Sequence, residues 1–210
     1  MYLYKMNLWQ VFLAGGAVMW PILACSIFAF AISLEKFLYL RRISAETEDF
    51  LKKIFEKMKR REIKEALQVC EASRIPLANI LKAGILKFDR PRQQIIEALE
   101  DASMYEIPII KKNLGALATI AHITPLLGFL GTVTGMIKCF QAIQLKSANL
   151  YAIPTAELAG GIWQALLSTV AGLIVAIPTY VIYNYLADRI NGFISEMEKA
   201  AAESVNLLTE

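Results

Sequence analysis

The stretch NLGALATIAHITPLLGFLGTVTGMI, residues 113–137, contains no Asp, Glu, Lys or Arg. Residues 6–34 and residues 158–187 are also free of these four residue types. About 20 apolar residues in an α-helix, each rising about 1.5 Å, cross the hydrocarbon core of a bilayer, and all three stretches are longer than that. A soluble domain would have to expose such helices to water. The sequence therefore predicts an all-α, polytopic membrane protein with three transmembrane helices.

The charged residues of this 210-residue chain gather between the first and second uncharged stretches. Residues 36–112 carry 17 of the 22 Lys and Arg residues and 12 of the 19 Asp and Glu residues. Such mixed charge is typical of a solvated helical surface and not of the basic stripe that binds nucleic acid. Because cytoplasmic loops of membrane proteins are enriched in Lys and Arg, we expect this region and the C-terminal tail to be cytoplasmic and the N-terminus to lie outside.

The uncharged stretches and the hydrophobic periodicity together divide the chain into seven segments. These are an outer N-terminal segment (1–13), a first transmembrane helix (14–38), a cytoplasmic helical region (39–112), a second transmembrane helix (113–138), a short outer loop (139–157), a third transmembrane helix (158–187) and a cytoplasmic C-terminal helix (188–210).

Within the cytoplasmic region, the periodicity predicts that the first helix continues to about residue 61. Short helices are expected over residues 63–72 and from Pro76 to about Phe88. Asp89-Arg90-Pro91 is a helix-start signal, because Asp can cap free N–H groups and Pro is tolerated in a first turn. We expect one uninterrupted helix from there through the second transmembrane helix.

The sequence contains no signature of enzymatic chemistry. There is no Gly-rich phosphate loop before a Lys and no HExxH motif, and a single His cannot build a His-rich site. The three Cys residues have no metal-ligand or disulfide spacing. We therefore expect no enzymatic activity, no cofactor and no metal.

Small residues form a strip along each of the last two predicted transmembrane helices, at about 100° per residue. The strip in the second helix comprises Thr124, Gly128, Gly131 and Gly135, with Thr132 beside it. The strip in the third helix comprises Ala165, Thr169, Gly172 and Ala176. Small residues let helices approach closely in lipid, so the strips predict a packing seam. Alternatively, they border a polar path, because Thr hydroxyls can hydrogen-bond water or a proton carrier.

Polar groups inside the uncharged stretches are few. His122 is the single classical ionisable side chain there, which makes it either a proton relay or a side chain satisfied by its surroundings. Gln164 lies about 140° around the helix from Thr169, so the two do not line one narrow strip. The stretches contain no Asp or Glu. If this protein handles protons, a partner must supply the carboxylate.

Three groups of residues resemble the MotA/TolQ/ExbB proton-channel family, in its ExbB/TolQ branch. They are Ala98-Leu-Glu-Asp with Glu106-Ile-Pro108, then Ala118-Thr-Ile-Ala121 with Thr124-Pro-Leu-Leu-Gly-Phe-Leu-Gly-Thr-Val-Thr-Gly-Met136, and Gly161 to Leu173 with Ala176-Ile-Pro178. The three predicted spans and the large first cytoplasmic region are also similar to that branch.

The resemblance implies a homopentamer in the bacterial inner membrane, with its N-terminus and outer loop in the periplasm and its last two transmembrane helices lining a pore. A single-span partner similar to ExbD or TolR is implied inside the pore, carrying protons on a membrane Asp. A TonB- or TolA-like protein would pass the energy to the outer membrane. Thr132 and Thr169 match the family's polar pore-lining pair. Gln164 stands where some members have Glu, which keeps hydrogen bonding and removes titration.

Three functions follow from these observations. The first is a subunit of a proton-motive-force-driven motor, of ExbB type for uptake or of TolQ type for envelope integrity. The second is a helical membrane scaffold that packs by its small-residue strips and conducts nothing. The third, a small secondary transporter, is disfavoured because the sequence shows no evident internal repeat.

Overall fold

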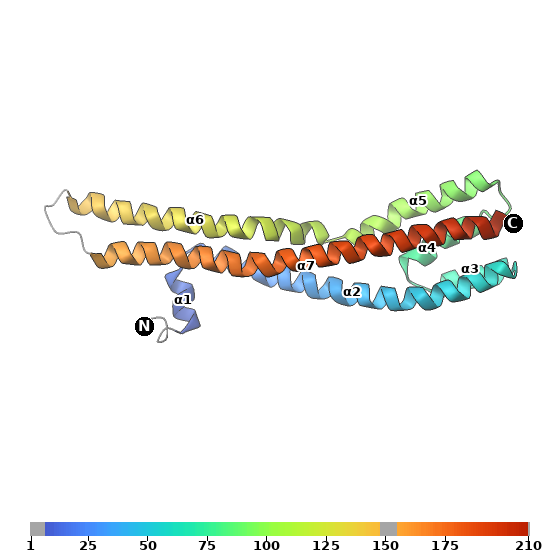
Figure 1. The fold of residues 1–210 in the computed structure, drawn as a ribbon, viewed down its shortest axis with the longest axis horizontal. Coiled ribbons are helices and arrows are strands. Elements are labelled where there is room, and N and C mark those ends of the chain that lie inside the picture. The colour runs from blue at the N-terminus through green and yellow to red at the C-terminus, as the bar shows by residue number, and fades with distance from the viewer. Residues whose placement is uncertain (1–6, 148–154, 210) are drawn as a thin grey trace. The chain divides into compact units, whose positions relative to one another are not determined.

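A computed structural model describes residues 7–147 and 155–209 of the chain, and the regular structure in them is entirely α-helical. The helices are α1 (Leu8–Ala14), α2 (Met19–Lys59), α3 (Ile63–Ala72), α4 (Pro76–Ile85), α5 (Arg92–Lys111), α6 (Leu114–Ser147) and α7 (Thr155–Thr209) (Figure 1). Three helical stretches, within Met19–Lys59, Arg92–Gln144 and Leu158–Thr209, are long and apolar enough to cross a membrane. The prediction of an all-α polytopic membrane protein is confirmed.

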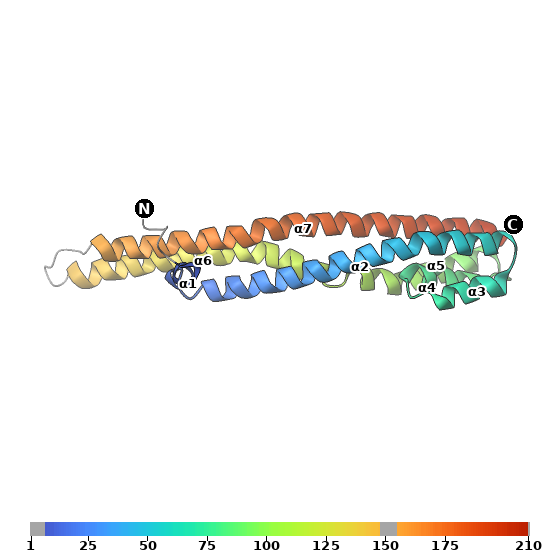
Figure 2. The ribbon, with the colours of Figure 1, turned by 90° about the horizontal axis from the view of Figure 1, so that it is seen from below.

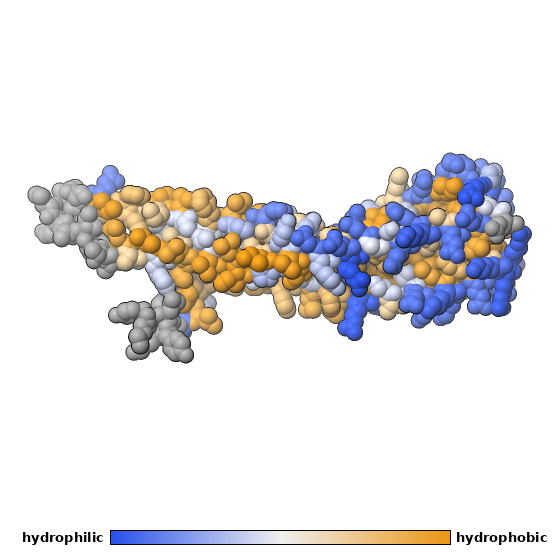
Figure 3. Space-filling view, viewed as in Figure 1, coloured by the Kyte–Doolittle hydropathy of each residue, from blue (hydrophilic) through white to orange (hydrophobic). Residues whose placement is uncertain are grey.

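The described chain divides into two compact units. Unit 1 consists of the described residues of Met1–Ser33 and Gly115–Asn184, and unit 2 consists of those of Leu34–Leu114 and Tyr185–Glu210. Unit 1 holds nearly all of the three uncharged stretches, and its surface is largely hydrophobic (Figure 3). Unit 2 holds the charged region and the C-terminal helix, and hydrophilic side chains are much more frequent on its visible surface than on unit 1 (Figure 3). The surface of unit 1 therefore suits a lipid environment, and the surface of unit 2 suits water.

In unit 1, α6 and α7 run side by side in opposite directions (Figures 1 and 2). Gly128 of α6 lies against Thr169 of α7, whereas Gly135, further along α6, lies against Gly161, which is earlier in α7. The short helix α1 precedes α2, and Gly16 between them has a φ of 79°, a conformation that glycine adopts without strain. The antiparallel pair of α6 and α7 positions the candidate site.

In unit 2, the core forms around α4, the most completely buried helix of the unit. Its Leu77, Ala78, Leu81 and Ile85 are fully buried. Gly84 allows α5 to approach, because a Cβ at this position would meet the side chain of Leu99. The polar residues of α4 lie at its surface, where Asn79 donates to Glu106 and Lys82 pairs with Glu71. This unit therefore behaves as a helical bundle with its own hydrophobic core.

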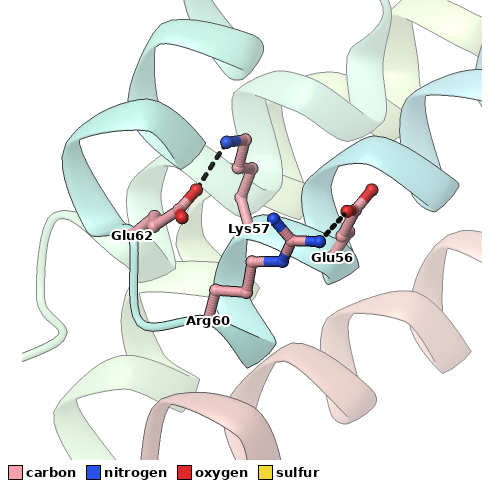
Figure 4. A network of polar contacts seen from close by, with 4 residues as sticks. All are labelled: Glu56, Lys57, Arg60 and Glu62. Atoms are coloured by element: carbon pink, nitrogen blue, oxygen red, sulfur yellow. Dashed lines mark hydrogen bonds and ion pairs between the residues drawn. The ribbon is translucent and has the colours of Figure 1, made fainter.

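Two ion pairs lie at the turn from α2 to α3, and the pair of Lys57 with Glu62 spans it (Figure 4). Arg60 pairs with Glu56 at 2.7 Å, and Lys57 pairs with Glu62 at 2.5 Å. The hydrogen bond between Lys57 and Glu62 raises the pKa of the Lys57 ammonium and lowers that of the Glu62 carboxyl. Arg61, between these pairs, has a left-handed φ of 58°, which ends α2. The predicted continuation of the first helix and the short helix over 63–72 are confirmed.

The expectation of one unbroken helix from Pro91 through the second membrane stretch is wrong. The chain leaves helical geometry at Lys112, whose ψ is 142°, and Asn113 has a left-handed φ of 64°. Asn tolerates this conformation, and basic residues in a last turn favour a helix end. Lys111, Lys112 and Asn113 thus carry a stop signal that outweighs the continuous helical periodicity.

Two smaller differences concern helix ends. The predicted first membrane segment, 14–38, includes a break between α1, which ends at Ala14, and α2, which starts at Met19. Helix α4 ends at Ile85, three residues before the expected end. The membrane boundaries 14–38, 113–138 and 158–187 remain predictions. Residues 1–6 of the predicted N-terminal segment and residues 148–154 of the predicted outer loop lie outside the described residues.

Candidate functional site: the seam between α6 and α7

The seam between α6 and α7 begins with a contact of backbone against backbone. A Cβ on Gly128 would stand 3.1 Å from the Cα atom of Thr169, and a Cβ on Gly172 would stand 2.8 Å from the carbonyl oxygen of Thr124. The Thr169 hydroxyl donates a hydrogen bond of 3.1 Å to the carbonyl oxygen of Gly128. The two helices thus approach as closely as their backbones allow at this level.

Ser168 fills the space that Gly131 leaves free. A Cβ on Gly131 would overlap the Ser168 side chain, which is fully buried. The Ser168 hydroxyl donates to the carbonyl oxygen of Ala165 at 2.8 Å. Ser168, which lies about 100° around the helix from the predicted strip residue Thr169, is the most deeply buried hydroxyl on α7, and it was not among the predicted site residues.

The seam continues with small side chains toward the end of α6. Gly135 lies against Ala165 and the carbonyl oxygen of Gly161, and Cys139 lies against Gly161. The Cys139 thiol donates to the carbonyl oxygen of Leu158 at 3.5 Å. Ala176, the last member of the predicted strip on α7, is also buried.

Thr132 lies beside the seam and not within it. Its side chain is partly exposed, and its hydroxyl donates to the carbonyl oxygen of Phe129 on its own helix at 2.6 Å. Among the described residues, no hydrogen bond joins Thr132 to Thr169 or to Gln164. The structure of one chain therefore does not bring the three predicted polar residues into a single hydrogen-bonded group.

Gln164 belongs to a separate polar cluster. Its Oε1 atom accepts a hydrogen bond of 3.1 Å from the Lys138 ammonium. Its amide nitrogen lies against Gly16, where a Cβ would overlap it. Lys138 was not among the predicted site residues. It is the first charged residue after the second uncharged stretch, which is the signal that could have identified it.

His122 lies on the opposite side of α6 from its buried neighbour Thr124 and is exposed. Its Nδ1 atom is 2.8 Å from the carbonyl oxygen of Ala118 on the same helix. The edge of its ring meets the Tyr180 ring of α7, with centroids 6.1 Å apart. His122 is thus held by local contacts and has no acidic partner among the described hydrogen bonds.

The chemistry of the whole seam is that of hydroxyls, one amide and backbone carbonyls. In the described part of unit 1, seven hydroxyls of α6 and α7 donate to backbone carbonyl oxygens, those of Thr119, Thr124, Thr132, Thr134, Ser168, Thr169 and Thr179. No cluster of three or more His, Cys, Asp or Glu residues suitable for a metal occurs in the described residues. Such a surface can hydrogen-bond a proton carrier, but residues 113–137 and 158–187 contain no Asp, Glu, Lys or Arg.

The fold and the seam define a polytopic helical membrane protein whose last two membrane helices form a tightly packed, hydroxyl-bearing pair. Residues 72–199 match the model of the MotA/TolQ/ExbB proton channel family. The chain belongs to this family, in its ExbB/TolQ branch. This is a transport family and not an enzyme family.

Relatives named ExbB and relatives named TolQ are both similar to this chain. An ExbB homologue of Methanothermobacter thermautotrophicus is 32% identical over 190 residues, which cover 90% of this chain and 66% of the relative. An ExbB-like protein of Synechocystis is 31% identical over 82% of this chain and 81% of the relative. The Tol-Pal system protein TolQ of Haemophilus influenzae is 36% identical over 46% of this chain and 40% of the relative. The chain thus spans just under two thirds of the archaeal relative's length. The relatives and the three apolar helices support an inner-membrane protein in biopolymer transport.

Proposed function

We propose that the chain is the pore-forming subunit of a proton-motive-force-driven motor. Five copies would surround the membrane helix or helices of a single-span partner similar to ExbD or TolR. The observation that carries this proposal is the chemistry of the uncharged stretches of α6 and α7, residues 113–137 and 158–187, which offer hydroxyls along a closely packed seam but no carboxylate. A proton path needs a group that titrates reversibly, so the partner's membrane Asp would supply it.

The proposal gives each site residue a role. Thr132 faces the partner, because it lies beside the seam with its side chain partly exposed. Thr169 offers its hydroxyl oxygen as an acceptor while its O–H continues to donate to the Gly128 carbonyl oxygen. Gln164 and Lys138 form the polar group near the outer ends of the two helices.

The remaining members of the seam hold these groups in place. They are Gly128, Gly131, Gly135, Ala165, Gly172 and Ala176. A partner of TonB or TolA type would receive the energy, since relatives named for both ExbB and TolQ are similar to this chain.

Replacing Thr132 or Thr169 by Val tests the proposal. Valine keeps the shape of threonine and removes its hydroxyl, so each variant should lose proton-dependent function in cells while the purified oligomer keeps its size. Thr134→Val is the matched control, because the Thr134 hydroxyl also donates to a carbonyl three residues earlier on α6. Normal function in both Val variants would overturn the pore assignment.

The same experiment separates the motor from a non-conducting scaffold. A scaffold is favoured by the fact that these seven hydroxyls of α6 and α7 are already bonded to backbone. In a scaffold, Thr132→Val and Thr134→Val should have equally small effects. In the motor, the effect of Thr132→Val alone should be large.

A further inference from the structure

A groove of about 440 Å³ lies between α2 and α7 within unit 2. Its lining starts at Phe37 on α2 and at Tyr185 on α7. Glu35 and Asp188 are the first charged residues after the first and third uncharged stretches. The groove therefore lies where apolar membrane helix gives way to charged helix, which is the depth of phospholipid headgroups.

The groove has an apolar floor and an aromatic entrance. Leu40, Leu186 and Phe193 line it and are buried, whereas Phe37 and Tyr185 are about half exposed. Aromatic side chains concentrate at membrane interfaces because one part of the ring system sits in apolar surroundings and the other in polar ones. The entrance therefore suits the glycerol and upper acyl region of a lipid.

Four charged side chains line the same groove: Arg41, Arg189, Asp188 and Glu196. Within the described residues none of the four forms an ion pair within 4 Å. The neighbouring Arg42, which does not line the groove, pairs with Glu46 at 2.8 Å. Two cations and two anions are thus available to a ligand that carries both charges.

Gly192 keeps part of the groove open. It lies within α7, where Gly is about 1 kcal/mol less favourable than Ala. A Cβ at this position would meet no described atom within 4 Å, so helix packing in this chain does not require the glycine. An occupant that approaches the helix backbone would explain why the space is left free.

We propose that this groove binds the headgroup of a zwitterionic phospholipid that has a phosphate and a primary ammonium, as in phosphatidylethanolamine. Arg41 and Arg189 would bind the phosphate oxygens, since guanidinium groups match phosphate geometry. Asp188 and Glu196 would accept hydrogen bonds from the ammonium. An anionic headgroup would meet these carboxylates unfavourably, and a choline headgroup has no N–H to donate. The proposal depends on membrane insertion alone and not on the pore.

Native mass spectrometry of the purified full-length protein can test the lipid preference. The protein is exchanged into detergent with phosphatidylethanolamine, phosphatidylglycerol or phosphatidylcholine of identical acyl chains. We expect phosphatidylethanolamine to be retained about tenfold better than the other two, which corresponds to 1.4 kcal/mol. Equal retention of all three lipids would overturn the proposal, and so would displacement of the lipid by inorganic phosphate at millimolar concentration.

Matched variants locate the binding. The double variant Arg41→Gln with Arg189→Gln should lose the preference, whereas Arg42→Gln should keep it. Asp188→Asn with Glu196→Gln should shift the preference toward phosphatidylglycerol, because the remaining charges are then both positive. Gly192→Leu should expel the lipid by filling the groove without changing a charge.

Unchanged lipid retention in both the double Arg variant and Gly192→Leu would contradict the assignment. A cysteine at position 192 that crosslinks to a second copy of the chain at the expense of lipid would also contradict it, because protein would then cover the groove.

Discussion

The hydroxyl of Thr169 on α7 donates a hydrogen bond of 3.1 Å to the carbonyl oxygen of Gly128 on α6. This bond joins the two helices that carry the proposed pore residues. It exists because Gly128 has no side chain, so that the Thr169 backbone can approach within van der Waals distance. The small size of Gly128 on α6 therefore determines where the Thr169 hydroxyl of α7 lies.

Enlarging the seam glycines should separate the helices. A Cβ at position 131 would overlap the buried Ser168 side chain, so Gly131→Ala should destabilise the protein by about 1–3 kcal/mol. Thermal unfolding in detergent measures the change. The control is Gly115→Ala, because a Cβ at Gly115 meets nothing within 4 Å and should be neutral or slightly stabilising. Equal effects of the two variants would show that the seam is not tightly packed.

Lys36 should hold the end of α5. It is 3% exposed, and its ammonium donates to the carbonyl oxygen of Ile110 at 3.2 Å, one of the last carbonyls of that helix. Because charged hydrogen bonds contribute about 1.5–3 kcal/mol, Lys36→Met should destabilise unit 2 and accelerate amide exchange in residues 110–114.

The exposed pair of Lys52 with Glu48 provides the comparison for Lys36. Lys52→Met should cost less than about 0.5 kcal/mol, since solvent-exposed ion pairs are weak. If amide exchange in residues 110–114 is the same in both variants, Lys36 does not cap α5.

Much of the fold could be predicted from the sequence, for a physical reason. Long uncharged stretches and helical periodicity are properties of each segment alone, so the three apolar helices and the helix over 63–72 follow directly. The break at Lys112 and Asn113 was missed because two signals conflict there. Periodicity continues through the break, while the basic residues and Asn favour a helix end, and the Lys36 ammonium of α2 donates to the Ile110 carbonyl oxygen there.

The site could be predicted only in part. Glycine spacing indicated which face of α6 packs closely, and the structure places Gly128, Gly131 and Gly135 against α7. Which residues lie opposite depends on the relative register of two helices, and the sequence of each helix does not contain that register. Ser168 opposite Gly131, and Lys138 beside Gln164, therefore emerge only from the structure.

Cys70 should be chemically inert in the folded protein. Burial raises the pKa of its thiol to about 12, so almost no thiolate forms at pH 8. Alkylation followed by mass spectrometry should show Cys70 unmodified until denaturant is added. The unfolded chain ionises this thiol from about pH 8.5, so its contribution to stability should be intact at neutral pH and decline as the pH rises toward 12. Rapid labelling of native protein at pH 8 would argue against this burial.

Position 164 should tolerate replacement of Gln by Glu better than replacement by Leu. The Lys138 ammonium donates to the Gln164 side-chain oxygen at 3.1 Å, and a Glu carboxylate could accept the same bond. We expect Gln164→Glu to keep proton-dependent function and Gln164→Leu to reduce it severalfold, measured in the same cells. Adding Lys138→Met should reduce proton-dependent function more in the Gln164→Glu variant than in the parent protein, because it would leave the new carboxylate without its cation. Equal effects in both backgrounds would indicate that Lys138 and position 164 are not coupled.

The most direct test of the central claim is proton flux into liposomes under an imposed membrane potential. Three preparations are compared: this chain alone, this chain with its single-span partner, and the same complex with the partner's membrane Asp changed to Asn. Because the uncharged stretches of α6 and α7 provide hydroxyls but no carboxylate, we predict flux for the complete complex only. Equal flux from this chain alone, or from the complex with the Asn variant, would contradict the claim that the partner carries the proton.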